Sequence, residues 1–187
     1  MTEDLKPWFP IRTERLLLRE FTQDDFDDVH AYATDDDVIR YMDWGPNTPA
    51  ETQAALDRWF EARPHWPRTD MNLAIEHLAD DRVIGSIRLG VRDEATRTGD
   101  IGYSLASAYW RQGLGAEAAR AMLRAGFEVL KLRRIWADCD IRNIGSYGIM
   151  EKLGMRREAH FRQDKPARDG WRDSYLYAIL AEEWLAA

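Results

Sequence analysis

The chain has 187 residues, of which 45% are hydrophobic and 32% are charged, and its formal net charge is −7. This composition is typical of a globular protein of one domain, and the acidity argues against nucleic acid or an anionic membrane as a partner. The single cysteine, Cys139, excludes an intramolecular disulfide and a multi-cysteine metal site. Since no apolar run is long enough to span a membrane and the charged N-terminus is unlike a signal peptide, we expect a cytoplasmic protein.

The N-terminal part of the chain is predicted to begin with an arm and a strand. Residues 1–10 contain two prolines and form an irregular arm, which Trp8 and Phe9 anchor, while residues 11–187 form one domain. The strongly apolar run 15–19 indicates a first strand that is covered on both faces.

Three helix starts follow, each marked by a polar cap. Thr22 and Asp25 resemble a capping pair before an apolar stripe, on which His30 falls as a core or boundary residue. The adjacent aspartates 35–37 start a short helix, an interpretation that we prefer to a metal site. The segment 48–51, Thr-Pro-Ala-Glu, is a capping box with proline at the first helical position.

The rest of the chain alternates between strand and helix patterns. The order of elements predicts a single-domain α/β fold with a mixed central sheet of about seven strands, flanked by about four helices. The predicted elements are a hairpin over 71–92, a strand over 100–105, a helix over 115–130, a strand over 134–139, a helix over 143–153, and strands over 156–162 and 171–180 joined by a polar loop, 164–170.

The segment 109–119 places Gly113 and Gly115 between a strand and a helix. Glycines let the backbone approach a ligand closely, and the first N–H groups of a helix lack internal partners and carry partial positive charge. The turn is therefore predicted to bind phosphate or pyrophosphate. A Walker loop does not fit because its lysine is missing, and Ala118 and Ala119 stand where a dinucleotide-binding loop has its third glycine. Alone, the pattern is equally typical of an ordinary helix start.

A second motif follows the strand that ends near Cys139, where Asn143 and Ser146 stand one turn apart at a helix start. Together with residues 110–116, it resembles the GNAT superfamily of acyl-CoA-dependent N-acyltransferases. More narrowly, the chain resembles the branch that contains the ribosomal-protein N-terminal acetyltransferases (RimJ/RimL-like). Three further segments look like that branch: 13–19, 100–103 and 173–184.

The resemblance implies that acetyl-CoA is the cosubstrate and that no metal takes part. In the family, amides of the glycine turn hold the CoA pyrophosphate, and the pantetheine arm lies between splayed strands, which here end near Leu105 and Cys139. Asn143 matches a family asparagine that hydrogen-bonds this arm, although it is also a typical helix cap. The implied cofactor-binding residues are Leu105, Arg111, Gln112, Gly113, Leu114, Gly115, Ala116, Asn143 and Ser146.

Amide formation from an amine and a thioester needs a neutral amine, a held carbonyl oxygen and a proton for the leaving thiolate. Many family members supply the proton from a tyrosine at the position of Met150 in this chain. In the ribosomal branch the proposed acid is a serine, which Ser146 matches, although a hydroxyl there is also common at a helix start. The family often places a glutamate base where Asp100 stands, and His160 and Tyr103 are weaker alternatives.

These expectations favour an N-acetyltransferase that acts on a primary amine, with a protein or peptide N-terminus as the preferred acceptor. Keeping a lysine-like amine neutral at pH 7 costs roughly 4–5 kcal/mol, against about 1 kcal/mol for an α-amine. A small amine such as an aminoglycoside or polyamine is the alternative acceptor, and Met150 leaves a non-catalytic acyl-CoA-binding module open. A homodimer is also open, since the eight tryptophans can lie in the core or at an interface.

Overall fold

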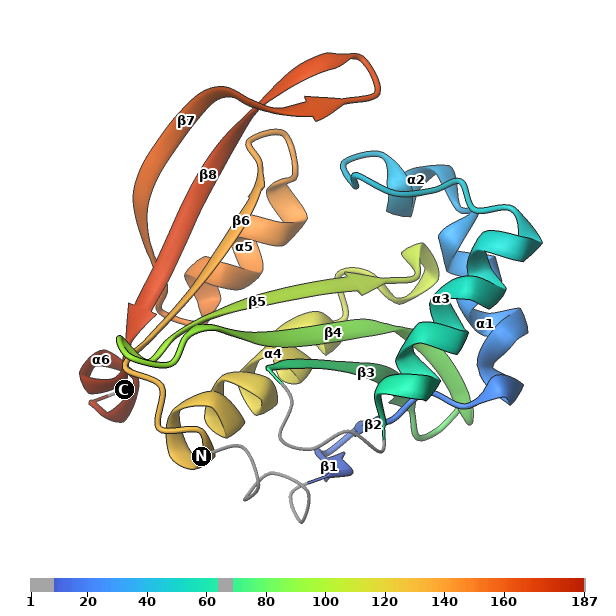
Figure 1. Cartoon of the computed structure of the whole chain (residues 1–187), viewed down its shortest axis with the longest axis horizontal. Helices are drawn as coiled ribbons and strands as arrows, with labels where there is room; N and C mark the ends of the chain where they lie inside the picture. The colour runs from blue at the N-terminus through green and yellow to red at the C-terminus, as the bar shows by residue number, and fades with distance from the viewer. Residues whose placement is uncertain (1–8, 64–68, 187) are drawn as a thin grey trace.

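A mixed sheet organises the part of the chain that the computed structural model describes, residues 9–63 and 69–186 (Figure 1). Its strands are β1 (Ile11–Arg12), β2 (Leu16–Arg19), β3 (Asp70–His77), β4 (Arg82–Asp93), β5 (Thr98–Leu105), β6 (Arg134–Asp140), β7 (Arg156–Ala167) and β8 (Gly170–Leu180). The order across the sheet is β1-β2-β3-β4-β5-β6-β8-β7. Every adjacent pair is antiparallel except β5 and β6, which run parallel. The predicted mixed α/β fold is confirmed, with eight strands in place of about seven.

Six α-helices lie within the described residues, where about four were expected. They are α1 (Phe26–Ala33), α2 (Asp36–Ile39), α3 (Pro49–Ala62), α4 (Leu114–Arg124), α5 (Ile144–Lys152) and α6 (Ala181–Leu185). Local sequence determines where they begin. The Thr48 hydroxyl accepts a hydrogen bond from the Glu51 amide, and the Glu51 carboxylate accepts one from the Thr48 amide at 2.7 Å, which confirms the capping box. Asp35 caps α2 by accepting from the amide of Asp37 at 3.0 Å.

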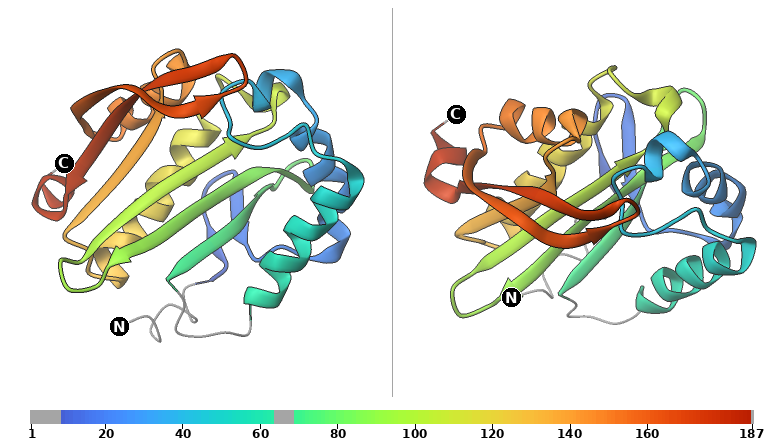
Figure 2. Two further views of the ribbon diagram at one scale, coloured as in Figure 1. Left: turned by 45° about the horizontal axis from the view of Figure 1, so that its top comes forward. Right: turned by 90° about the horizontal axis from the view of Figure 1, so that it is seen from above.

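The two faces of the sheet carry separate hydrophobic cores. Because successive side chains of a strand point to opposite faces, Leu73 and Ile75 of β3 lie in the larger core and Ala74 lies in the smaller one. The larger core packs the sheet against α4 and α5, and the smaller core contains residues of α1 and α3. Figure 2 shows α1, α2 and α3 grouped together, apart from α4 and α5.

The structure corrects the sequence interpretation where the periodic signal is weak. The predicted loop 164–170 is shorter than expected, since β7 runs to Ala167 and β8 starts at Gly170, which leaves only residues 168–169 as the turn of a long hairpin. Most of β7 is polar and exposed, so the alternation that marks a strand is missing there. The short elements β1 and α6 gave no periodic pattern, and the predicted helix over 115–130 ends in a π-helical turn, Ala125–Val129.

The N-terminal predictions have mixed outcomes. Residues 1–8 of the predicted arm, with Trp8, lie outside the described residues, and Phe9 packs against the larger core. In β2, Leu16 and Leu18 are fully buried while the alternate positions are partly exposed, so only one face of this strand is completely covered.

Candidate active site

The parallel strands β5 and β6 separate partway along their length (Figure 1). They pair at three positions, of which Asp100–Trp136 is the last. Beyond it, β5 keeps its antiparallel partner β4 as far as Leu105, and β6 keeps β8 as far as Asp140. Each strand is held on its outer edge, and the inner edges diverge. The splay expected between the strands that end near Leu105 and Cys139 is confirmed.

A cleft of about 1710 Å³ opens at this split. Its lining comes from β5, β6 and the starts of α4 and α5, and it extends to the β7–β8 hairpin and the segment that follows α2. Typical small-molecule pockets measure roughly 300–1,000 Å³. The cleft is therefore large enough for an extended cosubstrate and a second molecule together.

The predicted anion-binding turn forms part of the cleft wall. Gly113 is the N-cap of α4 with a φ of 80°, a left-handed conformation that glycine adopts without strain. The amides from Leu114 to Ala116 begin the helix without intrahelical partners, and these residues line the cleft together with Arg111. A Cβ added to Gly113 would meet no closer heavy atom than Arg15 Nη2 at 3.6 Å, so its backbone is open to a ligand.

Two residues of the turn differ from the others. Gly115 is buried, and a Cβ added there would lie 2.8 Å from Ile149 Cδ1, so this glycine allows α4 to pack closely on α5. Among the described residues that line the cleft, Gln112 is missing, because its side chain donates to the carbonyl of Ala108 at 3.1 Å. The expectation that glycine clears a ligand's approach therefore applies to Gly113.

A carboxylate that sequence analysis did not single out supports the turn. Glu117, in the first turn of α4, accepts hydrogen bonds from Thr13 Oγ1 at 2.6 Å and from the Arg15 amide at 2.9 Å, and its ion pair with the Arg15 guanidinium measures 2.7 Å. Arg15 Nη1 also donates to the Gln112 carbonyl at 2.9 Å. Burial raises the pKa of Glu117, but the bonds from Thr13 and Arg15 outweigh it and lower the pKa below its ordinary value. We call Thr13, Arg15 and Glu117 the turn clamp.

The start of α5 brings the predicted amide and hydroxyl to the cleft. Asn143 lines the cleft and caps the helix, since its Oδ1 accepts from the Ser146 amide at 3.1 Å, and the cap does not use the Nδ2 donor. Tyr103 Oη donates to the Ser146 carbonyl at 2.9 Å and so ties β5 to α5. Met150 is 2% exposed and belongs to the larger core. Burial raises the pKa of Cys139 to about 11, which keeps this cleft thiol protonated and a poor nucleophile.

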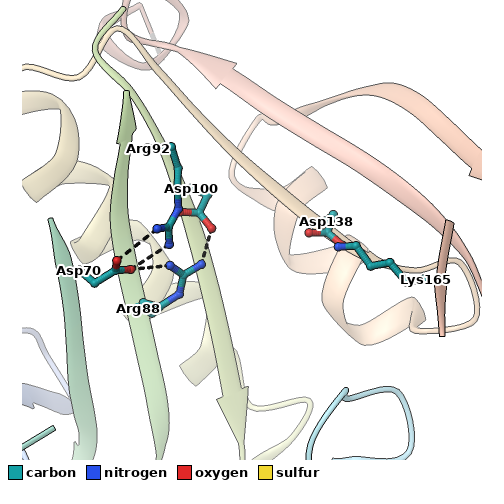
Figure 3. Close-up of polar contacts among 6 residues, drawn as sticks. All are labelled: Asp70, Arg88, Arg92, Asp100, Asp138 and Lys165. Atoms are coloured by element: carbon teal, nitrogen blue, oxygen red, sulfur yellow. Dashed lines mark hydrogen bonds and ion pairs between the residues drawn. The ribbon is translucent and has the colours of Figure 1, made fainter. Parts of the chain in front are cut away.

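Asp100, the candidate base, lies in a compact cluster of charges (Figure 3). One carboxylate oxygen accepts from Arg92 Nε at 2.5 Å, and the other is paired with Arg88. Both arginines also pair with Asp70, at 2.7 and 2.8 Å. Burial raises the pKa of Asp100, and the Arg92 guanidinium opposes this shift. Both oxygens of Asp100 are thus occupied, and it is absent from the described residues that line the cleft.

The other titratable candidates are satisfied by neighbouring groups. His160 Nε2 lies 2.8 Å from an Asp173 carboxylate oxygen on the exposed hairpin. Burial raises the pKa of Tyr103, whose hydroxyl is already engaged. His30 Nδ1 lies 2.9 Å from Thr52 Oγ1, as expected of a satisfied boundary histidine.

A second ion pair, which the sequence did not indicate, lies inside the cleft. Asp138 of β6 accepts from Lys165 Nζ of β7 at 2.5 Å (Figure 3). Arg172 Nη2 of β8 lies 3.5 Å from the same carboxylate oxygen. All three residues line the cleft. Arg172 Nη1 also donates to the Tyr41 carbonyl at 3.0 Å, which joins the hairpin to the segment after α2 (Figure 2).

The described residues, 9–63 and 69–186, contain no cluster of three or more His, Cys, Asp or Glu side chains placed to hold a metal ion. None of their helices is long and apolar enough to cross a membrane.

A parallel strand pair that splits beside an amide-lined helix start defines the GNAT type of N-acetyltransferase, an enzyme class that uses acetyl-CoA. The chain belongs to this family, since the acetyltransferase (GNAT) domain matches residues 15–156. Over 178 residues it is 36% identical to the uncharacterized N-acetyltransferase YnaD of Bacillus subtilis, covering 93% of this chain and 98% of that one.

Two other relatives support the assignment. The crystal structure of a GNAT-family acetyltransferase from Bacillus anthracis superposes with a TM-score of 0.81 at 35% identity, covering 92% of this chain and 98% of the other. The putative ribosomal N-acetyltransferase YdaF of Bacillus subtilis is 28% identical over 139 residues, which cover 72% of this chain and 76% of YdaF.

Proposed function

We propose that this enzyme acetylates the α-amine at the N-terminus of a protein or peptide, as in the RimJ/RimL-like branch. The observation that carries the proposal is the pairing of Asn143 and Ser146 at the start of α5, beside the open amides of α4 and the split between β5 and β6. The similarity to YdaF, a putative ribosomal N-acetyltransferase, agrees with this acceptor. A cytoplasmic location, where new protein N-termini are available, is part of the proposal.

In this proposal the turn before α4 holds the cosubstrate. The amides of residues 113–116, with the Arg111 side chain, would bind the CoA pyrophosphate through partial and full positive charge. The pantetheine arm would pass between Leu105 and Asn143, whose free Nδ2 group can donate to an amide carbonyl. The residues fit such an arm, because a Cβ added to Gly102, on the cleft wall at the split, would meet no heavy atom within 4 Å.

The charges of the cleft favour an acceptor with a single amine. Among the residues that the structure describes, eight arginines and lysines line the cleft against five aspartates and glutamates, although the chain as a whole carries a net charge of −7. A polyamine or aminoglycoside carries several positive charges and would meet an excess of like charge here. A peptide N-terminus presents one amine, followed by neutral carbonyl groups that accept hydrogen bonds from basic side chains.

Ser146 is the group that we assign to protonate the leaving thiolate. It lines the cleft at the start of α5, whereas Met150, which also lines the cleft but is only 2% exposed, has no transferable proton. A thiolate with a pKa near about 8.5 needs less assistance than an alkoxide, so a hydroxyl donor is sufficient.

The test is an acceptor panel with acetyl-CoA, read as release of free thiol. The panel holds a short lysine-free peptide with a free N-terminus, a matched peptide with a blocked N-terminus and one lysine, spermidine, and an aminoglycoside. We expect the first peptide to give the highest kcat/KM, because its amine is the least costly to keep neutral. Faster turnover of spermidine or the aminoglycoside would contradict the proposed acceptor and leave the acetyltransferase assignment in place.

A further inference from the structure

Asp138 is the first carboxylate beyond the point where β5 and β6 separate. It lies two residues after Trp136, the last paired residue of β6, which is about 7 Å along the strand. Its neighbours Ala137 and Cys139 are buried in the core that contains α4 and α5, so the Asp138 side chain projects from the opposite face of the sheet. A molecule that reaches the split from that face meets Asp138.

One oxygen of this carboxylate is fixed and the other is open. Oδ2 accepts from Lys165 Nζ at 2.5 Å (Figure 3) and also lies 3.5 Å from Nη2 of Arg172, which the figure does not draw. Among the residues that the structure describes, none donates a hydrogen bond to Oδ1. The side chain is 19% exposed and lines the cleft, and Oδ1 is not one of the buried atoms that lack a partner, so this oxygen is accessible from the cleft. An open acceptor in a ligand cleft therefore points to a donor on the ligand.

The other carboxylates near the split are not available in this way. Those that line the cleft are Asp37, Asp43, Glu51 and Asp140. Asp140 is 1% exposed, and both its oxygens accept from Arg142. The remaining three residues are exposed on α2, on α3 and in the segment between these helices. Asp100 has both oxygens on arginines and lies outside the lining.

We propose that Asp138 is a catalytic residue that receives the acceptor amine on Oδ1 and takes its proton, an inference that rests on the acetyl transfer proposed above. The amine nitrogen uses its lone pair to form a bond to the acetyl carbonyl carbon, and the carbon–sulfur bond then breaks. The surplus proton on nitrogen passes to Asp138 Oδ1. The sulfur receives a proton from Ser146, and both side chains return to their first state by exchange with water. Lys165 is a positioning residue, because it acts by holding Oδ2.

The test compares Asp138→Asn with Asp37→Asn, the same chemical change at a cleft carboxylate that is exposed and pairs with Arg40. The probe is the short lysine-free peptide with a free N-terminus. Loss of a general base typically costs 10²–10⁴-fold, so Asp138→Asn should lower kcat/KM for the peptide by about a hundredfold or more. Calorimetry should show unchanged acetyl-CoA affinity, and Asp37→Asn should stay within about twofold of the wild type.

A folded Asp138→Asn enzyme with peptide turnover within about threefold of the wild type would overturn the inference and leave the proposed function standing. Should Asp138→Asn not fold, Asp138→Glu decides the question, because it keeps the charge and displaces the oxygen by one methylene group. We then expect roughly a tenfold loss, and wild-type turnover would overturn the role. A wild-type enzyme that binds acetyl-CoA but acetylates no amine of the panel would overturn the proposed function and this inference with it.

Discussion

The turn clamp offers a sharp test of how the fold positions the cosubstrate site. Glu117→Gln keeps the size of the side chain but replaces one acceptor oxygen with an NH2 group. One side of the carboxylate faces the amide of Arg15 and the hydroxyl of Thr13, and the other faces the Arg15 guanidinium. The glutamine oxygen can accept hydrogen bonds on only one of these sides, and on the other side the new NH2 group faces a hydrogen-bond donor of Thr13 or Arg15.

The expected loss follows from these contacts. A hydrogen bond that involves a charged group contributes about 1.5–3 kcal/mol to stability. Because the Arg15 side chain is 42% exposed, solvent weakens its interaction with Glu117 and lowers this contribution. We therefore expect Glu117→Gln to lower the free energy of unfolding by roughly 1–2 kcal/mol, or Tm by about 3–6 °C in a chain of this length. Because Arg15 also holds the Gln112 carbonyl, acetyl-CoA affinity should fall as well.

The assay is urea unfolding at pH 7 and at about pH 3, with calorimetric titration of acetyl-CoA at pH 7. The pKa of Glu117 is lowered in the folded state, so its contribution is present above the ordinary pKa of glutamate. That contribution is lost as the pH falls through the lowered pKa. The stability difference between wild type and Glu117→Gln should therefore shrink at the lower pH.

Glu128→Gln is the matched control, since Glu128 makes an exposed ion pair with Arg124 at 3.3 Å and should cost less than about 0.5 kcal/mol. Two results would refute the reasoning. The first is equal stability of Glu117→Gln and Glu128→Gln. The second is a destabilised Glu117→Gln variant that binds acetyl-CoA like the wild type, which would separate the clamp from the site.

The other predictions concern single groups of the cleft. Ser146→Ala should reduce kcat by roughly ten- to a hundredfold with little change in acetyl-CoA affinity, and a wild-type kcat would leave thiolate departure to water. Asn143→Asp keeps the helix-capping oxygen and removes the Nδ2 donor. Calorimetry should therefore show about two- to tenfold weaker acetyl-CoA binding at near-normal Tm. Asn143→Ala removes both the capping oxygen and the donor, so its Tm should fall as well. Gly115→Ala should change the free energy of urea unfolding by less than about 1 kcal/mol, because the new methyl group meets only the terminal Cδ1 of Ile149 and alanine favours a helix over glycine by about 1 kcal/mol. A loss above about 2 kcal/mol would show that Ile149 cannot move aside.

Local patterns predicted most of the secondary structure, because caps and periodicity act over a few residues. The capping box at Thr48, the N-cap at Asn143 and the glycine at Gly113 all lie where short-range rules place them. The polar end of β7, residues 163–167, was missed, since a strand exposed on both faces carries no apolar alternation.

The parts of the site that depend on tertiary contacts could not be predicted in the same way. Glu117 meets Thr13 across 104 residues, and Asp138 meets Lys165 across 27, so no short pattern joins them. Asp100 was selected for its place in a family motif, and only its neighbours reveal that two arginines occupy its oxygens. Local sequence can indicate a candidate catalytic side chain, but whether its oxygens are free to bind a substrate depends on the residues packed around it.

The split between β5 and β6 gives the reacting groups access from both faces of the sheet. Past Asp100 and Trp136 the inner edges of the two strands have no partner in the described sheet, and buried backbone groups need one. An arm that carries amides can supply that partner and would be held in one place by it. Tyr103 fixes the start of α5 to β5 through the Ser146 carbonyl. In the proposed reaction, Ser146 and Asp138 would serve opposite faces of one opening, with the amine entering on one side and the thiol leaving on the other.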